Sequence, residues 1–504
     1  MKMSMERGGS PSGLAGPMPR ATNFARREAE TRARRVAMLD ALADERDRWR
    51  QKNDFYYRSI EELVRFVVPA GARVLEIGCG TGDLLAALAP AEGVGVDISP
   101  RMLDVARGKY PHLEFVVADA ESLEAPALEG RTFDYVVMSD VVGQLSDVWA
   151  AFRALRRFTH PRTRIFISYY NFLWEPVLRL GERAGLKMPI EQQNWLGMQD
   201  LANLLALNHL EVIRSGTALL VPRAIPLLAR FANRYLARLP GLRHLCLTHF
   251  FVARPAPGPI PSRDYSCSVV VPCRNERGNV DDIVARTPDM GRATEIVFVD
   301  GNSNDGTVQE IERHIAQGTR PGLRLIHQGA GTGKGDAVRK GFAAATGDIL
   351  FILDADLTVP PEDLPKFYAA VAEGKAEFVN GSRLVYPMEG KAMRFLNLLG
   401  NKGFGMALSF ILGQRLKDTL CGTKVLLRRD YERIAAARGF FGDFDPFGDF
   451  DLLFGAAKQN LKLVELPVRY RDRTYGETKI SRFRHGWLLA KMTLHAFRRF
   501  RLAY

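Results

Sequence analysis

Residues 348–356 read DILFILDAD, in which five apolar residues are followed directly by two carboxylates, Asp354 and Asp356. A short apolar run rich in aromatic and β-branched residues is typical of a buried strand. Open α/β sheets bind ligands beyond the carboxyl ends of their strands, where both carboxylates stand. Two carboxylates on one bend can share a hard divalent cation such as Mg²⁺ or Mn²⁺. The stretch therefore predicts an α/β sheet with a metal site, although an Asp-x-Asp triplet alone is usually a polar turn.

Two strands with polar ends precede this stretch. Residues 267–276 (CSVVVPCRNE) read as a buried strand that runs into a polar turn. Residues 295–307 (EIVFVDGNSNDGT) read as a second strand, whose last residue is Asp300, and a turn. Thr307 and Glu310 have the spacing of a capping box, so part of this turn serves to start a helix. Asp300 occupies the strand end at which such sheets bind ligands.

The first half of the chain shows the same order of strand, glycine turn and helix. Residues 73–77 (RVLEI) are a predicted strand, and residues 78–82 (GCGTG) are a tight turn before a helix. Glycine permits positive φ and a close backbone approach to a ligand, and a helix N-terminus supplies N–H donors. The next strand ends in Asp97, a carboxylate suited to gripping a ribose diol.

The size and composition of the chain fit two catalytic domains. A chain of 504 residues exceeds what one core usually organises, and 46% hydrophobic residues exclude a mainly disordered or collagen-like chain. Residues 255–262 (PAPGPIPS) carry four prolines, favour extended, unpacked chain and divide the sequence almost in half. The five cysteines include no CxxC pair, which indicates neither a disulfide framework nor a zinc site and favours a reducing cytoplasm.

The net charge of +13 calls for an anionic partner. Residues 478–504 hold seven Lys or Arg and no acid, and residues 390–417 hold five and no acid, both among many apolar residues. Neither segment has the roughly 18 uninterrupted apolar residues of a spanning helix, so they predict helices that bind an anionic membrane surface. Partly buried helices with a solvated basic face are the alternative. Nucleic acid is not expected, because these stretches lack a recognised module and carry too many Leu and Phe.

Residues 53–254 resemble the Rossmann-like S-adenosylmethionine-dependent methyltransferases. The resemblance rests on VLEIGCGTG (74–82), GVDIS (95–99), VVADAESL (116–123) and FDYVVMSDVVGQL (133–145). It implies S-adenosylmethionine as the cofactor and the following cofactor-binding residues: Glu76, Gly78, Gly80, Gly82, Asp97, Asp119 and Ala120. Gly78 and Gly80 would line the methionine portion, Asp97 the ribose hydroxyls and Asp119 the adenine amino group. Gly143-Gln144 stands where many relatives have an acid and a histidine, which leaves the methyl acceptor open.

The second half resembles the inverting GT-A glycosyltransferases that include dolichol-phosphate mannose synthase and bacterial polyprenyl-phosphate glycosyltransferases. The motifs that carry the resemblance are PCRNE (272–276), VDGNSNDGT (299–307), GTGKGDAVRKGF (331–342), DADLTVPPEDL (354–364), NGSR (380–383), DTLCGTK (418–424) and RTYGETK (473–479). It implies a nucleotide sugar bound by Pro272, Glu276, Asp300, Lys334, Asp354, Arg473 and Lys479, and a metal bound by Asp354 and Asp356. Arg383 and Arg394 would meet the phosphate of a polyprenyl phosphate acceptor.

A lipid phosphate is already ionised at neutral pH and can attack the anomeric carbon without a catalytic base. A hydroxyl acceptor would need one, for which Asp449 and Asp451 are candidates. Thr358 stands where relatives often have Gln, Gly301 replaces a second Asp and Lys424 replaces an Arg. These departures leave the identity of the sugar open.

We therefore expect an α/β protein of two tandem domains, a Rossmann-like methyltransferase sheet and a GT-A sheet. The expected segments are a disordered N-terminus (1–22), a methyltransferase domain (23–254), a Pro-rich linker (255–263), a GT-A domain (264–483) and a basic amphipathic C-terminal helix (484–504). The expected function is metal-dependent sugar transfer to a polyprenyl phosphate, with methylation in the same glycan or lipid pathway, peripherally on the inner face of the cell membrane. Transfer to a polysaccharide hydroxyl, or a membrane-docked scaffold with one inactive domain, are the alternatives.

Overall fold

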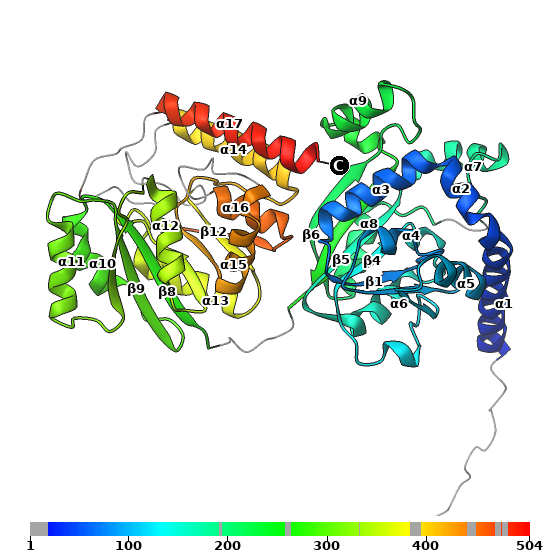
Figure 1. Ribbon diagram of the computed structural model, residues 1–504, viewed down its shortest axis with the longest axis horizontal. Coiled ribbons are helices and arrows are strands. Elements are labelled where there is room, and N and C mark those ends of the chain that lie inside the picture. The colour runs from blue at the N-terminus through cyan, green and yellow to red at the C-terminus, as the bar shows by residue number, and fades with distance from the viewer. Residues whose placement is uncertain are drawn as a thin grey trace, which may run out of the picture.

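The structure is a computed structural model, and it describes residues 19–190, 194–257, 264–331, 333–383, 395–440, 450–468, 475 and 482–503. Within these residues the chain folds into two α/β units, each built on a seven-stranded sheet (Figure 1). The predicted fold class, a Rossmann-like methyltransferase sheet followed by a GT-A sheet, is confirmed.

The first sheet has the strand order β3-β2-β1-β4-β5-β7-β6. Its strands are β1 (Arg73–Ile77), β2 (Glu92–Asp97), β3 (Glu114–Val117), β4 (Phe133–Ser139), β5 (Thr159–Tyr170), β6 (Leu210–Ala218) and β7 (Thr248–Pro255). The five strands from β3 to β5 are parallel, so the carboxyl ends of β1, β2 and β4 meet at one edge. β7 is antiparallel to both of its neighbours, β5 and β6. Pro255, the first residue of the expected linker, is the last residue of β7 and pairs with Leu210.

Helices surround this sheet on both faces. They are α1 (Pro19–Leu42), α2 (Arg46–Lys52), α3 (Asp54–Val67), α4 (Asp83–Ala87), α5 (Pro100–Lys109), α6 (Val148–Leu155), α7 (Glu175–Arg183), α8 (Met198–Leu207) and α9 (Leu228–Arg234). Local sequence sets where they start: the Ser99 hydroxyl accepts from Met102 N–H at 3.1 Å, and Pro100 opens α5. A side-chain acceptor at the N-cap and a proline in the first turn both favour a helix start.

The second sheet has the order β10-β9-β8-β11-β13-β12-β14. Its strands are β8 (Ser266–Cys273), β9 (Ala293–Asp300), β10 (Leu323–His327), β11 (Ile349–Ile352), β12 (Phe378–Ser382), β13 (Lys424–Leu427) and β14 (Leu463–Pro467). β13 is antiparallel to both of its neighbours. The other described pairs are parallel, which brings the ends of β8, β9 and β11 to one edge.

The helices of the second half are α10 (Val280–Arg286), α11 (Thr307–Ala316), α12 (Gly333–Ala344), α13 (Leu364–Ala372), α14 (Phe395–Leu412), α15 (Arg428–Ala436), α16 (Phe450–Lys458) and α17 (Arg482–Arg501). Figure 1 shows α14 and α17 lying side by side along one side of the second sheet. Among the described residues, no helix combines the length and the apolar character that crossing a bilayer requires.

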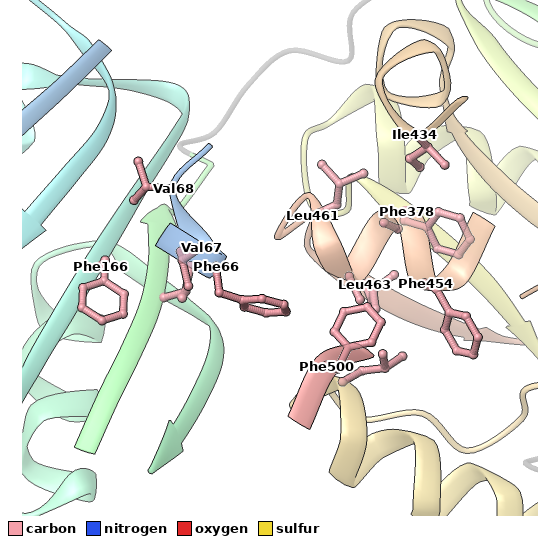
Figure 2. Packing of buried hydrophobic residues seen from close by; sticks show 14 of the residues in the cluster. Phe66, Val67, Val68, Phe166, Phe378, Ile434, Phe454, Leu461, Leu463 and Phe500 are labelled. Atoms are coloured by element: carbon pink, nitrogen blue, oxygen red, sulfur yellow. The ribbon is translucent and has the colours of Figure 1, made fainter. Parts of the chain in front are cut away.

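The two units share one apolar core. Phe66, at the end of α3, projects toward the second unit (Figure 2), where Phe500 contacts it and Phe454 packs on Phe500. The rings of Phe66 and Phe500 pack edge to face with centroids 6.2 Å apart. A proline-rich connection therefore does not leave the units independent, because buried apolar side chains join them.

A buried polar network lies beside this apolar contact. Arg164 on β5 donates to the Glu377 carboxylate at 2.6 Å and to the Asn460 carbonyl at 2.7 Å. Arg254 on β7 approaches the same carboxylate at 3.4 Å and donates to the Gly374 carbonyl at 3.2 Å. Burial alone would raise the pKa of Glu377, but the two guanidinium groups hold it below its ordinary value. The buried charges of Arg164, Arg254 and Glu377 thus partner one another, as burial requires.

Candidate functional site

The paired carboxylates of the second half stand where the sequence predicted, directly after β11. Lys334, on the first turn of α12, places its ammonium 2.6 Å from Asp354 Oδ1. Burial would raise the pKa of Asp354, but the charge and hydrogen bond of Lys334 hold it below the ordinary value. Asp354 is therefore an ionised oxygen donor at neutral pH, and a cation already lies against it.

Gly422 closes this cluster from β13's side. A Cβ atom at residue 422 would lie 1.9 Å from Asp354 Oδ2 and 2.5 Å from Lys334 Nζ. No side chain fits at those distances, so the glycine in DTLCGTK lets backbone approach the carboxylate and the ammonium closely.

Asp356 is oriented by its own bend. Its Oδ1 accepts from the Thr358 backbone N–H at 3.1 Å and from the Thr358 hydroxyl at 2.8 Å. Thr358, the residue that departs from the family pattern, thus fixes the direction of the Asp356 carboxylate. Two donors on one oxygen set the rotamer of a potential metal ligand, as outer-shell partners of metal sites do.

The ends of β8 and β9 are braced against each other. Asn275, at positive φ, donates from its N–H to the Ser303 hydroxyl at 2.9 Å and accepts from the Asn304 N–H at 2.9 Å. Asp300 accepts from the Ser303 N–H at 3.2 Å, and the Glu276 N–H donates to the Thr307 hydroxyl at 2.9 Å. Pro272 and Asp300, the predicted nucleoside contacts, lie on these two adjacent strands. The predicted nucleoside residues are thus gathered at one edge.

Tyr475 brings one further motif to this edge. A Cβ atom at Gly278 would lie 2.6 Å from the Tyr475 ring, so the ring packs directly on the glycine that follows PCRNE. Tyr475 belongs to RTYGETK, whose predicted diphosphate residues Arg473 and Lys479 lie outside the described residues. Tyr475 itself therefore lies at the nucleoside end of the sheet.

Arg383 is held by a buried acid. Its guanidinium donates to both oxygens of Asp418 at 2.7 and 2.9 Å, and Asn401 donates to the same carboxylate at 2.8 Å. Burial would raise the pKa of Asp418, but these partners, with Arg383 first among them, lower it to about 2. Lys424 lies nearby, fully buried, and donates to Asn380 at 2.9 Å. Asp418 thus fixes the orientation of Arg383.

Asp451, a predicted candidate base, is paired with two guanidinium groups. Asp451, on the first turn of α16, lies 3.3 Å from Arg438 and 3.6 Å from Arg339. Its carboxylate is therefore part of an ion-pair cluster. Arg394 and Asp449 lie outside the described residues.

The first half carries its own edge site. Gly78, Gly80 and Gly82 all adopt positive φ, at 75°, 53° and 78°. Asp97 accepts from the Gly80 N–H at 2.8 Å and from the Ser99 N–H at 3.0 Å. Burial raises the pKa of Asp97, and these hydrogen bonds oppose that rise. The carboxylate at the end of β2 therefore shapes the glycine turn at the end of β1.

Glu76 lies beneath this turn on β1. It is buried, and burial raises its pKa to about 8, so the side chain is largely protonated at neutral pH. Its Oε2 has no hydrogen-bond partner among the described residues. A buried polar atom without a partner is costly and is satisfied when a ligand supplies the missing hydrogen bond.

The N-terminal helices cover this edge, a feature that the sequence did not reveal. Arg32 on α1 lies 2.5 Å from Asp119, the predicted adenine contact, which is followed by the buried Ala120. Asp40 accepts from the Arg101 N–H at 3.2 Å, and the Arg46 guanidinium faces the glycine turn near Gly80. The mixture of Ala, Arg and Glu over residues 23–50 predicts a polar, solvent-facing helix. Helices are present there, but Arg32, Asp40 and Arg46 contact groups at the sheet edge.

A second cluster lies at the end of β4, where the sequence drew attention to Gly143-Gln144 instead. Tyr56 donates its hydroxyl to Asp140 at 2.5 Å, and Ser168 donates to the same carboxylate at 3.4 Å. Asp140 adopts a φ of 57°, and burial raises its pKa. A Cβ atom at Gly78 would lie 2.6 Å from the side chain of Val141, so Asp140 is next to the glycine turn. The sequence signal for this cluster was Asp140, the acid that directly follows the fourth strand in the motif FDYVVMSDVVGQL.

Helix α17 corrects one membrane-binding assignment. Met492 and Phe500, which belong to the segment predicted to bind a membrane surface, are buried against the rest of the protein, as is Arg501. The Arg501 guanidinium donates to the Phe410 carbonyl on α14. The assignment is wrong for these three residues, because they lie on the face that packs against α14 and the shared core.

The two edges together define a nucleotide-sugar transferase unit and a cofactor-binding methyltransferase unit in one chain. Residues 268–435 match the family Glycosyl transferase family 2, and residues 48–215 match a family described as Methyltransferase domain. The second half of the chain belongs to glycosyl transferase family 2, fused to a methyltransferase domain.

The second half matches curated relatives, including the following two. The chain is 31% identical over 228 residues to the dolichyl-phosphate hexose transferase of Haloferax volcanii, covering 44% of this chain and 90% of that protein. It is 38% identical over 109 residues to the dolichol-phosphate mannosyltransferase of Saccharomyces cerevisiae, covering 21% of this chain and 40% of the length of that relative.

A solved structure matches the first half. It is an S-adenosylmethionine-dependent methyltransferase from Thermotoga maritima, with 18% identity, a TM-score of 0.35, and coverage of 44% of this chain and 99% of that one.

Proposed function

We propose that the second half transfers a sugar from a nucleotide diphosphate sugar to a polyprenyl phosphate with the help of a divalent metal. The observation that carries this proposal is the cluster of Asp354, Asp356 and Lys334 at the end of β11, inside a family 2 domain. Relatives that share this half are named for transfer to dolichol phosphate. The nucleotide sugar is the donor, and Pro272, Glu276 and Asp300 are proposed to bind its nucleoside.

The donor set fits Mg²⁺ or Mn²⁺. Asp354 is ionised, Asp356 is oriented by Thr358, and carboxylate oxygens are the ligands that hard cations prefer. Such a cation would neutralise charge that accumulates on the leaving nucleoside diphosphate. Lys334 is suited to bind a diphosphate oxygen beside it, and Arg473 and Lys479 are proposed to contribute from their loop. Either Mg²⁺ or Mn²⁺ is the proposed metal.

The acceptor phosphate needs orientation rather than deprotonation. Arg383, fixed by the Asp418 carboxylate, is the proposed contact for that phosphate, together with Arg394. A polysaccharide hydroxyl is the second candidate acceptor, with Asp449 or Asp451 as base. The pairing of Asp451 with two guanidinium groups favours the phosphate acceptor, because this carboxylate is already engaged.

The first half is proposed to methylate a product or precursor of the same pathway. Gly78, Gly80, Gly82 and Asp97 would hold S-adenosylmethionine, and the unpartnered oxygen of Glu76 supports a ligand at this turn. Asp119 and Ala120 would line the adenine, once Arg32 releases the carboxylate. The cofactor would supply an activated methyl group. Asp140, held by Tyr56, is the proposed base that accepts the proton of an acceptor hydroxyl.

The protein is proposed to act peripherally on the inner face of the cell membrane, from the cytoplasm. A polyprenyl chain stays in the bilayer, so the enzyme must come to it. The exposed side chains Trp487, Lys491, Leu494 and Arg498 recur at the spacing of one face of α17, a mixture of apolar and basic groups that suits an anionic surface.

A two-phase transfer assay tests this function. Purified protein, a labelled nucleotide sugar, Mn²⁺ and a short-chain prenyl phosphate should give label in the organic phase, and EDTA should abolish it. No label in the organic phase with prenyl phosphate, together with metal-dependent labelling of a polysaccharide offered in its place, would favour the polysaccharide acceptor. A rise in Tm with S-adenosylmethionine and with the metal, but no sugar transfer to prenyl phosphate or polysaccharide, would favour a membrane-docked scaffold.

A further inference from the structure

The segment from residue 219 to residue 247, here called the α9 hairpin, has an inverted distribution of apolar side chains. Its small residues Ala229, Ala232 and Ala237 are buried. Seven of its large apolar side chains are exposed: Ile225, Leu227, Leu228, Phe231, Tyr235, Leu239 and Leu245. Leu227 is 89% exposed and Phe231 is 54% exposed. A domain that met only water would bury these large side chains and expose the small ones.

The exposure belongs to an ordered structure. Asn233 accepts from the Val221 N–H and donates to the Val221 carbonyl, both at 2.8 Å, which fixes α9 to the start of the hairpin. Trp174 donates to the Leu245 carbonyl at 2.8 Å, and Asn171 donates to the Cys246 carbonyl at 2.9 Å. Because both ends of the hairpin are tied down, the apolar side chains are held on the surface.

The charge of the hairpin selects the kind of partner. Residues 219–247 contain five arginines and no Asp or Glu. Arg223, Arg230 and Arg234 are exposed among the apolar side chains. Large apolar groups mixed with arginines, without acids, are the composition of a surface that enters the headgroup region of an anionic bilayer. A second copy of the chain would bring like charges together, which disfavours self-association.

The hairpin is continuous with the second half. The Arg243 guanidinium lies 5.8 Å from the centroid of the Phe410 ring on α14, and Arg501 of α17 lies 4.8 Å from the same ring. Figure 1 shows α9, α14 and α17 along the same side of the molecule. Trp487, which is 67% exposed, and Leu494 add apolar side chains from α17.

We propose that the α9 hairpin is a second membrane-docking surface, carried by the methyltransferase half, and that it binds an anionic lipid bilayer together with the outward face of α17. This inference rests on the proposed action at a membrane and extends it, because nothing in that proposal requires the methyltransferase half to touch lipid. Docking through both halves would place both edge sites beside one bilayer, so the methyl acceptor would also be lipid-linked.

Flotation of the full chain with vesicles tests the proposal. Vesicles of phosphatidylcholine with phosphatidylglycerol are compared with pure phosphatidylcholine, using wild type and the triple variant Leu227→Gln, Leu228→Gln, Phe231→Gln. Ile315→Gln and Leu207→Gln are matched controls, because both side chains are large, apolar and exposed but lie outside the α9 hairpin. The triple variant should lose at least about tenfold in partitioning to anionic vesicles, while the controls keep wild-type binding. In a Phe231→Trp variant, brominated acyl chains should quench the new fluorescence, which they should not do for Ile315→Trp.

The outcomes separate this inference from the proposed function. Transfer of sugar to a short, soluble prenyl phosphate should be unchanged in the triple variant, which shows that the protein is folded and active. Wild-type partitioning of the triple variant would overturn the inference and leave α17 as the docking surface. A wild type that dimerises without lipid, with a monomeric triple variant, would assign the hairpin to an interface between copies and would also overturn it. Absence of sugar transfer in wild type, with lipid binding intact, would contradict the proposed function alone.

Discussion

Lys334 Nζ lies 2.6 Å from Asp354 Oδ1, so a lysine of α12 forms an ion pair with one of the two predicted metal ligands. Two consequences follow from this ion pair. The ammonium is placed to bind a diphosphate, and it competes electrostatically with a divalent cation until the donor arrives.

Lys334→Met should therefore separate donor binding from metal binding. Loss of a charge-assisted hydrogen bond, which contributes about 1.5–3 kcal/mol, should raise the Kd of the nucleotide diphosphate about 10- to 100-fold. Mn²⁺ binding without nucleotide should not weaken, because a competing cation is gone. Electron paramagnetic resonance of free Mn²⁺ and calorimetry of nucleotide binding measure the two effects. Weaker Mn²⁺ binding in the variant would contradict the role given to Lys334, and Lys366→Met on α13 serves as the control.

Asp356→Ala should abolish sugar transfer, with a loss of at least about a thousandfold, because a metal contributes several kcal/mol of charge stabilisation. S-adenosylmethionine binding should be unchanged, since Asp97 and the glycine turn belong to the other sheet. Asp282→Asn, an exposed carboxylate on α10, is the matched control. Undiminished transfer by Asp356→Ala in the presence of EDTA would remove the metal assignment.

Asp97→Ala should weaken S-adenosylmethionine binding, and more than the loss of ribose hydrogen bonds alone would predict. Each lost hydrogen bond to a charged group costs about 1.5–3 kcal/mol, and Asp97 also accepts from the Gly80 and Ser99 N–H groups that shape the turn. Asp97→Asn, which keeps one acceptor oxygen, should lie between wild type and Asp97→Ala. An unchanged Kd by calorimetric titration for Asp97→Ala would refute the cofactor assignment.

Asp140→Asn should lower the kcat of methyl transfer about 10²- to 10⁴-fold and leave the Kd for S-adenosylmethionine unchanged, because a base acts on the acceptor. Burial raises the pKa of Asp140. A base is active when ionised, so wild-type kcat should fall as pH drops through this raised pKa, at a higher pH than an ordinary Asp would show. Tyr56→Phe, which removes one hydrogen bond to the ionised form, should move this fall to still higher pH. The measurement is the S-adenosylhomocysteine formed when the lipid product of sugar transfer is the acceptor. An identical pH profile in wild type, Asp140→Asn and Tyr56→Phe would exclude Asp140 as the base.

Asp418→Asn should destabilise the second half by about 3–5 kcal/mol at neutral pH, because it leaves the Arg383 guanidinium without its buried partner. The pKa of Asp418 is lowered to about 2 in the folded protein, below the value of about 3.9 for an unfolded chain. Its contribution is therefore fully present above about pH 4 and is lost as pH falls toward 2. The difference in unfolding free energy between wild type and Asp418→Asn should narrow over that range. A difference that stays constant down to pH 3 in urea titrations would contradict the assignment.

The strands that carry both sites could be predicted from sequence. Each is a short apolar run, which indicates a buried strand, and Asp97, Asp300 or Asp354 marks its carboxyl end. The resemblance to methyltransferases and to glycosyltransferases followed from the motifs at those strand ends. The antiparallel strands β7 and β13 were not predicted, since pairing direction depends on contacts between distant segments.

The covering helix, the shared core and the Tyr56–Asp140 pair could not be read from the sequence for the same reason. Tyr56 and Asp140 are 84 residues apart, and no local pattern links them. The composition of α17 predicted a lipid-facing helix, but composition does not say which face packs inward, and Met492 and Phe500 turned out to be core residues. The exposed large apolar residues of the α9 hairpin were not predicted, because apolar residues are ordinarily core residues.

Mass spectrometry of the lipid product tests the central claim most directly. Purified protein is incubated with a panel of nucleotide sugars, a polyprenyl phosphate, Mn²⁺ and S-adenosylmethionine, and the organic extract is analysed. The account predicts a polyprenyl monophosphate that carries one sugar, formed only with metal and absent for Asp356→Ala. A product in which the sugar is joined through a diphosphate, or sugar found only on a glycan hydroxyl with the polyprenyl phosphate unchanged, would contradict it.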